Sequence, residues 1–288
     1  MALLCFLLFY WTTDFRQAQT AFSNYQFVGG AKWQCSLLDE LRKCLKAALR
    51  NQTSDRFYGI KSLVNKCTPS AIRLKPYRNK DETKMSIPPL AGANKDCILV
   101  TLGIGGDITA EQAFHRDFPH CHLYGADPTP KLGLPYQTVL GGSYSAVAVG
   151  ASTGRQRMSI YTAKGYQPVE VETRSLLDYL GKDVKLSGQS IDHLWMDVEG
   201  AEYPITQNLI LSNALDQARL SFCQWNAEFH SPHEMGLFNM TVKKFDAMLA
   251  GLVDRNLLPL HMEYVGHLRV FFFNFASKAC LSKYIDCP

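Results

Sequence analysis

The spacing of hydrophobic residues changes along this chain, and the change falls near residue 95. Before it, apolar residues between positions 36 and 50 recur every three or four residues, which predicts an amphipathic helix. Prolines then interrupt regular structure, and these are Pro69, Pro76, Pro88 and Pro89. We therefore expect a helical lead-in and linker over residues 21–94, followed by a second domain over residues 95–288.

Beyond residue 95, short apolar runs alternate with segments of helical spacing. The runs predict strands at 97–102, 121–126, 146–149, 191–198 and 220–229, with shorter extended pieces at 158–163 and 169–171. The helical spacing predicts helices at 108–118, 175–180 and 238–256. Strands separated by helices imply an α/β fold with a mostly parallel sheet and right-handed crossovers.

The last two strand-like runs are connected differently. Residues 260–265 and 268–275 flank Gly266-His267, a two-residue connection with glycine first. That pattern is typical of a type II′ turn, so we expect an antiparallel hairpin at the end of the sheet.

Composition narrows the classes of function. The chain has 288 residues, 47% of them hydrophobic, which is enough for one sizeable core. Its 30 Lys and Arg residues nearly balance 26 Asp and Glu residues, and a nucleic-acid binder would instead concentrate basic residues on one face. Basic residues do occur between positions 75 and 84, but Asp81 and Glu82 interrupt them, which favours a solvated linker.

An apolar run over residues 2–11 opens the chain. It is too short to cross a bilayer as a helix and has the length of the core of a secretory signal, although no basic segment precedes it. We interpret residues 1–20 as a signal peptide or short membrane anchor. The alternative is a packed N-terminal helix or a truncated start. The first interpretation places the protein in the secretory pathway or outside the cell, and the second in the cytoplasm.

Nine cysteines are many for a cytosolic protein of this length. Cys97, Cys121 and Cys223 lie in apolar strand-like runs, where we expect free buried thiols. Five others could form disulfides, and these are Cys35, Cys44, Cys67, Cys280 and Cys287. No C-x-x-C motif occurs, which excludes a zinc ribbon, and we assign no metal site.

A glycine-rich turn follows the first strand of the second domain. Gly103, Gly105 and Gly106 let the backbone approach a ligand closely, and Asp107 ends the turn. The spacing is not G-x-G-x-x-G, so the dinucleotide fingerprint is absent. A glycine turn without a ligand is the alternative.

Asp127-Pro128 follows the next strand. An acidic residue at this place can accept hydrogen bonds from the hydroxyl groups of a ribose. The alternative is that Asp127-Pro128-Thr129-Pro130 only forms a turn.

Carboxylates end the strand predicted at 191–198. Asp197 and Glu199 would point to the same side if the strand persists, because side chains alternate along a strand. Buried carboxylates of this kind are expected to be paired or to bind something. Glu202 has an alternative role at a helix N-terminus, where negative charge is favourable.

Histidines follow the strand predicted at 220–229. His230 and His233 could supply a general base or a metal ligand at the same edge of the sheet. Solvent-facing loop residues are the alternative.

These motifs resemble, in order, those of the FkbM-type methyltransferases, a family of S-adenosylmethionine-dependent O-methyltransferases. The resemblance covers about residues 97–275. Its most specific element is the DVEGAE segment, residues 197–202, and the glycine turn is its least specific.

The resemblance implies a class I methyltransferase fold, with a Rossmann-like seven-stranded sheet whose last strand is reversed. It implies that Gly103, Gly105 and Gly106 hold the methionine end of S-adenosyl-L-methionine. Asp107 and Pro128 are included in the cofactor set, with Asp127 on the ribose. Asp197 would face the sulfonium end and the acceptor. The chain departs from the family in having Thr101 where an acidic residue is usual and Asp107 in place of the last glycine.

Methyl transfer to a hydroxyl group benefits from a base that takes the proton. We assign this role to Asp197 or His230, with Glu199 nearby, and expect a small-molecule or glycan acceptor. The alternative function is a secreted or lumenal binding module that keeps the fold without catalysis. A nicotinamide-dependent oxidoreductase is disfavoured by the absent dinucleotide fingerprint and by the terminal hairpin.

Overall fold

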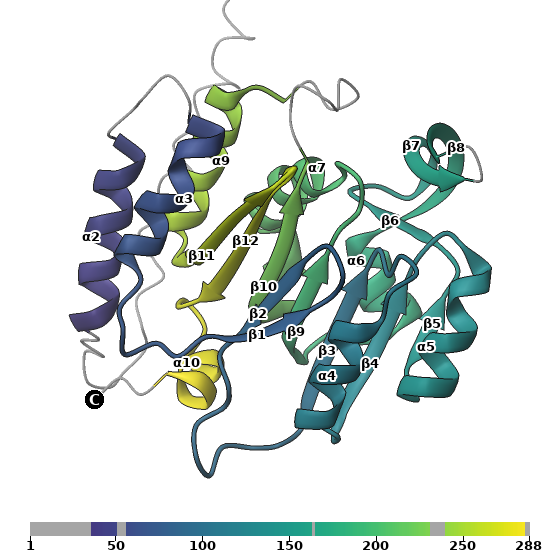
Figure 1. Cartoon of the computed structure of the whole chain (residues 1–288), viewed down its shortest axis with the longest axis horizontal. Helices are drawn as coiled ribbons and strands as arrows, with labels where there is room; N and C mark the ends of the chain where they lie inside the picture. Colours follow the sequence, from purple (N-terminus) through teal and green to yellow (C-terminus); the bar gives the residue numbers. More distant parts are fainter. Residues whose placement is uncertain (1–35, 51–55, 163–164, 231–239, 286–288) are drawn as a thin grey trace, which may run out of the picture. The chain divides into compact units, whose positions relative to one another are not determined.

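A seven-stranded sheet forms the centre of the computed structural model, which describes residues 36–50, 56–162, 165–230 and 240–285 (Figure 1). The strands lie in the order β11-β12-β10-β9-β3-β4-β5. Their bounds are Leu257–Val265, His267–Asn274, Ser221–Phe229, Ser190–Met196, Cys97–Leu102, Cys121–Ala126 and Ser143–Ser145. Strands β10, β9, β3, β4 and β5 are mutually parallel, whereas β12 is antiparallel to β10 and β11. The expected class I methyltransferase sheet is therefore confirmed.

Both faces of this sheet are buried, as the continuous apolar runs of its central strands require. Leu99 of β3 packs in a cluster with Phe114 and Trp195, whereas the next residue, Val100, packs in a larger cluster with Leu194. Alternate side chains of one strand thus reach opposite cores.

Helices connect and cover the strands. Their bounds are α2 Ser36–Arg50, α3 Arg56–Cys67, α4 Thr109–Asp117, α5 Gly133–Leu140, α6 Leu176–Asp178, α7 Glu202–Ile205, α8 Ala214–Gln217, α9 Val242–Asp254 and α10 Lys278–Tyr284. A 3-10 turn spans Pro130–Leu132, and π-helical turns span Tyr179–Asp183 and Thr206–Ile210. The helix predicted over 36–50 has the observed bounds, and those predicted over 108–118 and 238–256 are each shorter than expected.

Residues 75–86 differ from the expected solvated linker. They form an antiparallel hairpin of β1 (Lys75–Arg78) and β2 (Thr83–Ser86). The Met85 amide donates to Asn226 Oδ1 at 2.7 Å, which fastens the hairpin to β10. Lys84 is buried and pairs with Glu82. The ion pair offsets part of the cost of burying the ammonium group. Composition alone could not indicate this pairing.

The strand predicted at 146–149 is also placed differently. The main sheet takes up β5, and residues Ala148–Gly150 form β6 of a separate three-stranded sheet with order β6-β8-β7. The two short extended pieces expected beyond it are one antiparallel hairpin, β7 (Gly154–Thr162) and β8 (Gly165–Ser175).

The terminal antiparallel hairpin is confirmed, but its connection is not the expected two-residue turn of Gly266-His267, because His267 begins β12 and pairs with Val265. Strands β11 and β12 pair in an antiparallel register in which Tyr264 lies opposite Leu268. Gly266 has φ +72°, the backbone region that glycine enters without penalty.

Disulfides correct the expectation of free thiols at three positions. Within the described residues, Cys44 pairs with Cys67, Cys97 with Cys121, and Cys223 with Cys280. Cys97 and Cys121 are register partners on neighbouring strands, with Cα atoms 4.4 Å apart. Such proximity allows a bond between two side chains that each look like ordinary core residues. Predictions for Cys35 and Cys287 lie outside the described residues.

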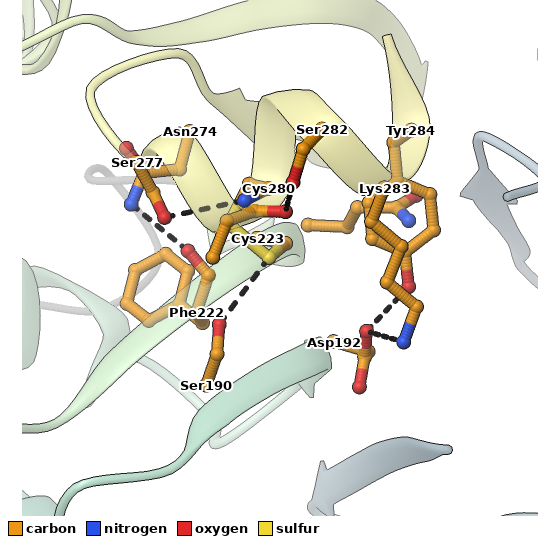
Figure 2. The surroundings of a disulfide bond; sticks show 12 residues. Ser190, Asp192, Phe222, Cys223, Asn274, Ser277, Cys280, Ser282, Lys283 and Tyr284 are labelled. Atoms are coloured by element: carbon orange, nitrogen blue, oxygen red, sulfur yellow. Dashed lines mark hydrogen bonds and ion pairs between the residues drawn. A yellow bond between two sulfur atoms is a disulfide. The ribbon is translucent and has the colours of Figure 1, made fainter. Parts of the chain in front are cut away.

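Helix α10 is tied to the sheet around one of these bonds (Figure 2). Cys223 lies on β10 and Cys280 on α10. Beside them, Asp192 Oδ1 lies 2.6 Å from Lys283 Nζ and accepts a hydrogen bond of 2.6 Å from the Tyr284 hydroxyl (Figure 2). These contacts give the buried Asp192 carboxylate its partners and hold α10 against β9.

No helix among the described residues is long and apolar enough to cross a membrane. The expected signal or anchor over residues 1–20 lies outside the described part of the chain.

Candidate active site

A cavity of about 420 Å³ lies at the carboxyl ends of β3, β4 and β9. It is lined by the turns after these strands, together with the β1–β2 turn and part of the small sheet. Open α/β sheets place ligands at this edge, where strand connections diverge. The sequence-predicted residues that line it are Gly103, Gly105, Gly106, Asp107, Asp127, Pro128, Asp197 and Glu199.

The glycine turn continues the hydrogen bonding of the sheet. The Gly103 amide donates to the Ala126 carbonyl at 2.9 Å, and the Asp197 amide donates to the Leu102 carbonyl at 2.9 Å. Gly103 and Gly105 have φ of +76° and +62°, which favours glycine at both positions. A Cβ atom on Gly105 or Gly106 would have no heavy atom within 4 Å, so their missing side chains leave open space along the cavity wall.

The Asp127 carboxylate holds the glycine turn through hydrogen bonds to its backbone amides. Its Oδ2 accepts hydrogen bonds from the amides of Ile104 at 3.2 Å and Gly105 at 3.3 Å, and Oδ1 accepts from Thr129 at 2.8 Å. The residue is 8% exposed and lines the cavity. A carboxylate has about four lone-pair sites, so acceptor capacity remains for a ligand.

Asp107 fixes the start of α4. Its Oδ1 accepts a 3.0 Å hydrogen bond from the Thr109 amide, and its Oδ2 accepts one of 3.1 Å from the Lys80 amide. Hydrogen bonds from Thr109 lower the pKa of the Asp107 carboxyl. The carboxylate therefore joins the glycine turn to the β1–β2 turn while lining the cavity.

Strand β9 ends at Met196, one residue before the first carboxylate. Asp197 and Glu199 thus lie beyond the strand, and the predicted alternation of strand side chains does not determine where they point. Instead, Glu199 and Gly200 have φ of +55° and +99°, and this turn brings both carboxylates to the cavity. A left-handed conformation at a glutamate is uncommon and is held here by the surrounding contacts.

His230 lies at the centre of these carboxylates. Its Nε2 is 3.1 Å from Glu199 Oε2 and 3.8 Å from Asp197 Oδ1, and its Nδ1 is 3.4 Å from Glu202 Oε1. Glu202 is fully buried and also accepts a 2.7 Å hydrogen bond from the Val198 amide. It is the first residue of α7, as the capping alternative expected, yet it faces the histidine as well.

Charge in this cluster shifts two pKa values. Burial acts to lower the pKa of His230, but the Glu202 charge, the Glu199 hydrogen bond and the Asp197 charge outweigh it and raise the value to about 12. Burial, followed by the charge of Glu228, raises the pKa of the Asp197 carboxyl well above its usual range. His230 is thus held as an imidazolium, and Asp197 has the stronger basicity of a desolvated carboxylate.

Sequence reasoning missed further charged residues that lie next to Asp197 and His230. Glu228 pairs with Arg269 at 3.0 Å, and Lys84 of the β1–β2 hairpin pairs with Glu82. The His267 ring centre lies 4.3 Å from that of His230. The short alternating segment over residues 83–86 was the available signal for the hairpin, but four residues are too few to distinguish a strand from a loop.

Negative charge dominates the cavity wall. Its carboxylates are Asp81, Glu82, Asp107, Asp127, Asp197 and Glu199, and its basic lining residue is Lys131. Such a wall repels anions and favours neutral or cationic groups.

Comparison with known families decides what the chain is similar to. The model of the methyltransferase FkbM domain matches residues 55–276, which is more than half of the chain. The chain belongs to the FkbM methyltransferase family. A search among curated proteins found no match.

Solved structures similar to this chain include three that hold S-adenosyl-L-methionine or S-adenosyl-homocysteine. M. capricolum TrmK with S-adenosyl-homocysteine is 11% identical with a TM-score of 0.33, the match covering 64% of this chain and 65% of TrmK. Aeropyrum pernix fibrillarin with S-adenosyl-L-methionine is 13% identical with a TM-score of 0.32, covering 62% and 67%. Human methyltransferase-like protein 13 with S-adenosyl-homocysteine is 14% identical with a TM-score of 0.34, covering 64% and 74%. The chain thus spans just under two thirds of the length of TrmK.

The family assignment confirms the resemblance drawn from the motifs. Of the candidate residues, Asp197, Glu199 and His230 come together, and the glycine turn and Asp127 form an adjoining wall. The prediction for His233 lies outside the described residues.

Proposed function

We propose that this FkbM-family chain is an S-adenosyl-L-methionine-dependent methyltransferase that methylates a hydroxyl group. The observation that carries the proposal is the cavity in which Gly103, Asp127 and Asp197 meet at the ends of three adjacent parallel strands. When bound, the cofactor supplies an electrophilic methyl group on a positively charged sulfur.

The residues present fit this cofactor. Gly105 and Gly106 leave room along the wall for the methionine end, and their turn brings backbone close to a ligand. Asp127 is assigned to the ribose through its remaining acceptor capacity. Asp107 and Pro128 complete this side of the cavity. The carboxylates of the wall favour a group that carries positive charge.

Asp197 is assigned as the base that takes the acceptor proton. The Asp197 side chain is 30% exposed and lines the cavity, so it can reach an acceptor. A raised pKa makes its carboxylate a better proton acceptor near neutral pH. His230 is held protonated, so its role is to orient Asp197 and Glu199 through the contacts described above.

The acceptor is proposed to be a small molecule or glycan with a hydroxyl group. A phosphate-rich acceptor such as a nucleic acid would meet six carboxylates and one lysine at the cavity wall. The disulfides within the described residues support an oxidising compartment, and we place the protein in the secretory pathway or outside the cell. Any membrane attachment is assigned to the N-terminal segment.

Calorimetry with S-adenosylmethionine, S-adenosylhomocysteine and NAD tests the cofactor assignment. We expect the first two to bind and NAD not to bind. Binding of none of them would contradict the proposal and favour the alternative, a lumenal or secreted module without catalysis.

Methyl transfer from labelled S-adenosylmethionine to a panel of glycans and small hydroxyl compounds tests the chemistry. Asp197→Asn is expected to reduce turnover roughly 100-fold, the size of a general-base contribution, while cofactor still binds. His230→Ala is expected to reduce it as well, and the exposed Asp216→Asn serves as the matched control. If both site variants kept full turnover with cofactor bound, the assigned roles would be wrong.

A further inference from the structure

The geometry points to a divalent cation site formed by Asp197, Glu202 and His230 on the acceptor side of the cavity. One candidate ligand atom from each of the three lies within 4.8 Å of the others, the spacing of residues that can share one ion. This differs from the sequence-based assignment, which included no metal.

Unpartnered atoms in this cluster support the assignment independently of its charge. Within the described residues, Asp197 Oδ1 and Glu202 Oε2 are buried atoms without a hydrogen-bond partner, and His230 Nδ1 has only its 3.4 Å ion pair with Glu202 Oε1. Glu202 is 0% exposed, so water does not reach its unpartnered oxygen. A buried carboxylate oxygen left without a partner costs free energy, which indicates a bound group at this place.

Distances within the cluster suit a coordination shell. Two neighbouring ligands at about 2.1 Å from an octahedral metal lie about 3 Å apart. His230 Nδ1 is 3.4 Å from Glu202 Oε1, and one ligand atom from each of Asp197, Glu202 and His230 lies within 4.8 Å of the others, so side-chain shifts toward one imidazole nitrogen would close the shell. Remaining positions would be free for water or an acceptor oxygen, because Asp197 faces the cavity.

Charge balance favours a cation at the same place. Asp197, Glu199 and Glu202 surround one imidazole, while Lys84 and Arg269 are engaged by Glu82 and Glu228. A divalent ion bound by His230 and two of these carboxylates would offset their negative charge.

The donor set indicates the type of ion. Two carboxylates suit Mg²⁺ and Mn²⁺, whereas an imidazole favours transition metals over Mg²⁺. Mn²⁺ accepts both kinds of donor and is the ion we assign. Its role in binding the acceptor oxygen and lowering the pKa of the hydroxyl rests on the proposed function, but its binding does not.

Electron paramagnetic resonance of Mn²⁺ tests the site on the full chain with its disulfides intact, without cofactor or acceptor. The signal of the free ion should fall as protein is added, with one Mn²⁺ bound per chain. Mg²⁺ should compete more weakly than Mn²⁺. Absence of binding, or stronger competition by Mg²⁺, would overturn the assignment.

Three substitutions locate the ion, namely Asp197→Asn, Glu202→Gln and His230→Gln. Each is expected to weaken Mn²⁺ binding at least roughly 100-fold, because the loss of an outer-shell partner alone already costs roughly 10- to 100-fold in metal affinity. Glu202→Gln keeps a carbonyl that can accept from Val198, and thermal unfolding without metal checks that each variant folds. Unchanged binding in the folded variants would refute the ligand set.

Two control variants separate this site from its surroundings. The exposed Glu172→Gln should bind Mn²⁺ as the unchanged protein does. Glu228→Gln should weaken binding less than Glu202→Gln does, because Glu228 belongs to neighbouring sets that share His230 and Asp197 with this site. Loss of binding in Glu228→Gln but not in Glu202→Gln would move the ion and contradict the inference. Calorimetry with S-adenosylmethionine is run separately and without metal. Failure of the cofactor proposal is therefore distinguishable from failure of the metal inference.

Discussion

The carbonyl oxygen of Asp197 lies where a side chain on Gly103 would begin. A Cβ atom built on Gly103 would come 1.6 Å from that oxygen and 2.8 Å from the carbonyl carbon. The loops after β3 and β9 therefore touch through backbone alone. The missing side chain of Gly103 therefore permits this close approach of the two loops that line the cavity.

Gly103→Ala is expected to lower the free energy of unfolding by at least about 3 kcal/mol, because the methyl group meets immovable backbone and φ is positive. Gly105→Ala has the same backbone conformation without a clash, so its cost should be about 1 kcal/mol. Gly106→Ala should be close to neutral, within about 0.5 kcal/mol. Urea unfolding of the three variants checks the order, and equal losses would show that the Asp197 contact has no special weight.

Much of this site could be predicted because its residues directly follow apolar strands. Gly103, Asp127 and Asp197 come one residue after β3, β4 and β9, and parallel strands bring their carboxyl ends to one edge. The sheet itself, including the reversed β12, follows from the same alternation of strands and helices and from the glycine-first hairpin.

Features that depend on long-range contacts could not be predicted in this way. The local sequence predicts a solvated Lys84. Its hairpin is instead held to β10 by the hydrogen bond from Met85 to Asn226, two residues that lie 141 positions apart. Cys97 and Cys121 look like free core thiols until the β3–β4 register places them side by side. Pairing partners and register come from tertiary structure, which local periodicity does not contain.

Asp127→Asn is expected to weaken both the glycine turn and cofactor binding. Asn has one carbonyl oxygen, so its amide group would face a backbone N–H of Ile104, Gly105 or Thr129 and lose those hydrogen bonds. Losing a hydrogen bond to a charged group costs about 1.5–3 kcal/mol, which corresponds to roughly 10- to 150-fold in affinity. Calorimetry with S-adenosylhomocysteine measures it, with the exposed Asp96→Asn as control. Unchanged affinity would remove Asp127 from the ribose site.

Replacing Cys223 and Cys280 together by alanine tests the bond that ties α10 to the sheet. The bond closes a loop of sequence separation 57, for which chain entropy predicts about 4 kcal/mol of stabilisation. The double variant should therefore unfold at clearly lower urea concentration. The matched pair Cys44→Ala with Cys67→Ala closes a shorter loop of separation 23 and should lose about 3 kcal/mol. A Cys223–Cys280 variant as stable as the unchanged protein would contradict the role of this bond.

Glu111 of α4 is expected to make stability depend on pH. It is 2% exposed, and its Oε2 has no hydrogen-bond partner within the described residues. Burial, opposed in part by the charge of Lys84, raises the pKa of this carboxyl from 4.5 to about 7. The unfolded chain releases the proton first, so stability is full below pH 4.5 and falls as the pH rises to 7. The loss at higher pH amounts to about 3 kcal/mol.

Glu111→Gln removes the ionisable group while keeping nearly the same shape. Urea unfolding of both proteins is compared between pH 4.5 and 8, and the difference in unfolding free energy isolates Glu111 from other titrating groups. Relative to the variant, the unchanged protein should lose about 3 kcal/mol across this range and then level off. The exposed Glu172→Gln should show no such difference. A difference that stays constant with pH would mean that Glu111 is charged in the folded protein, and a partner for its carboxylate would then have to be found beside α4.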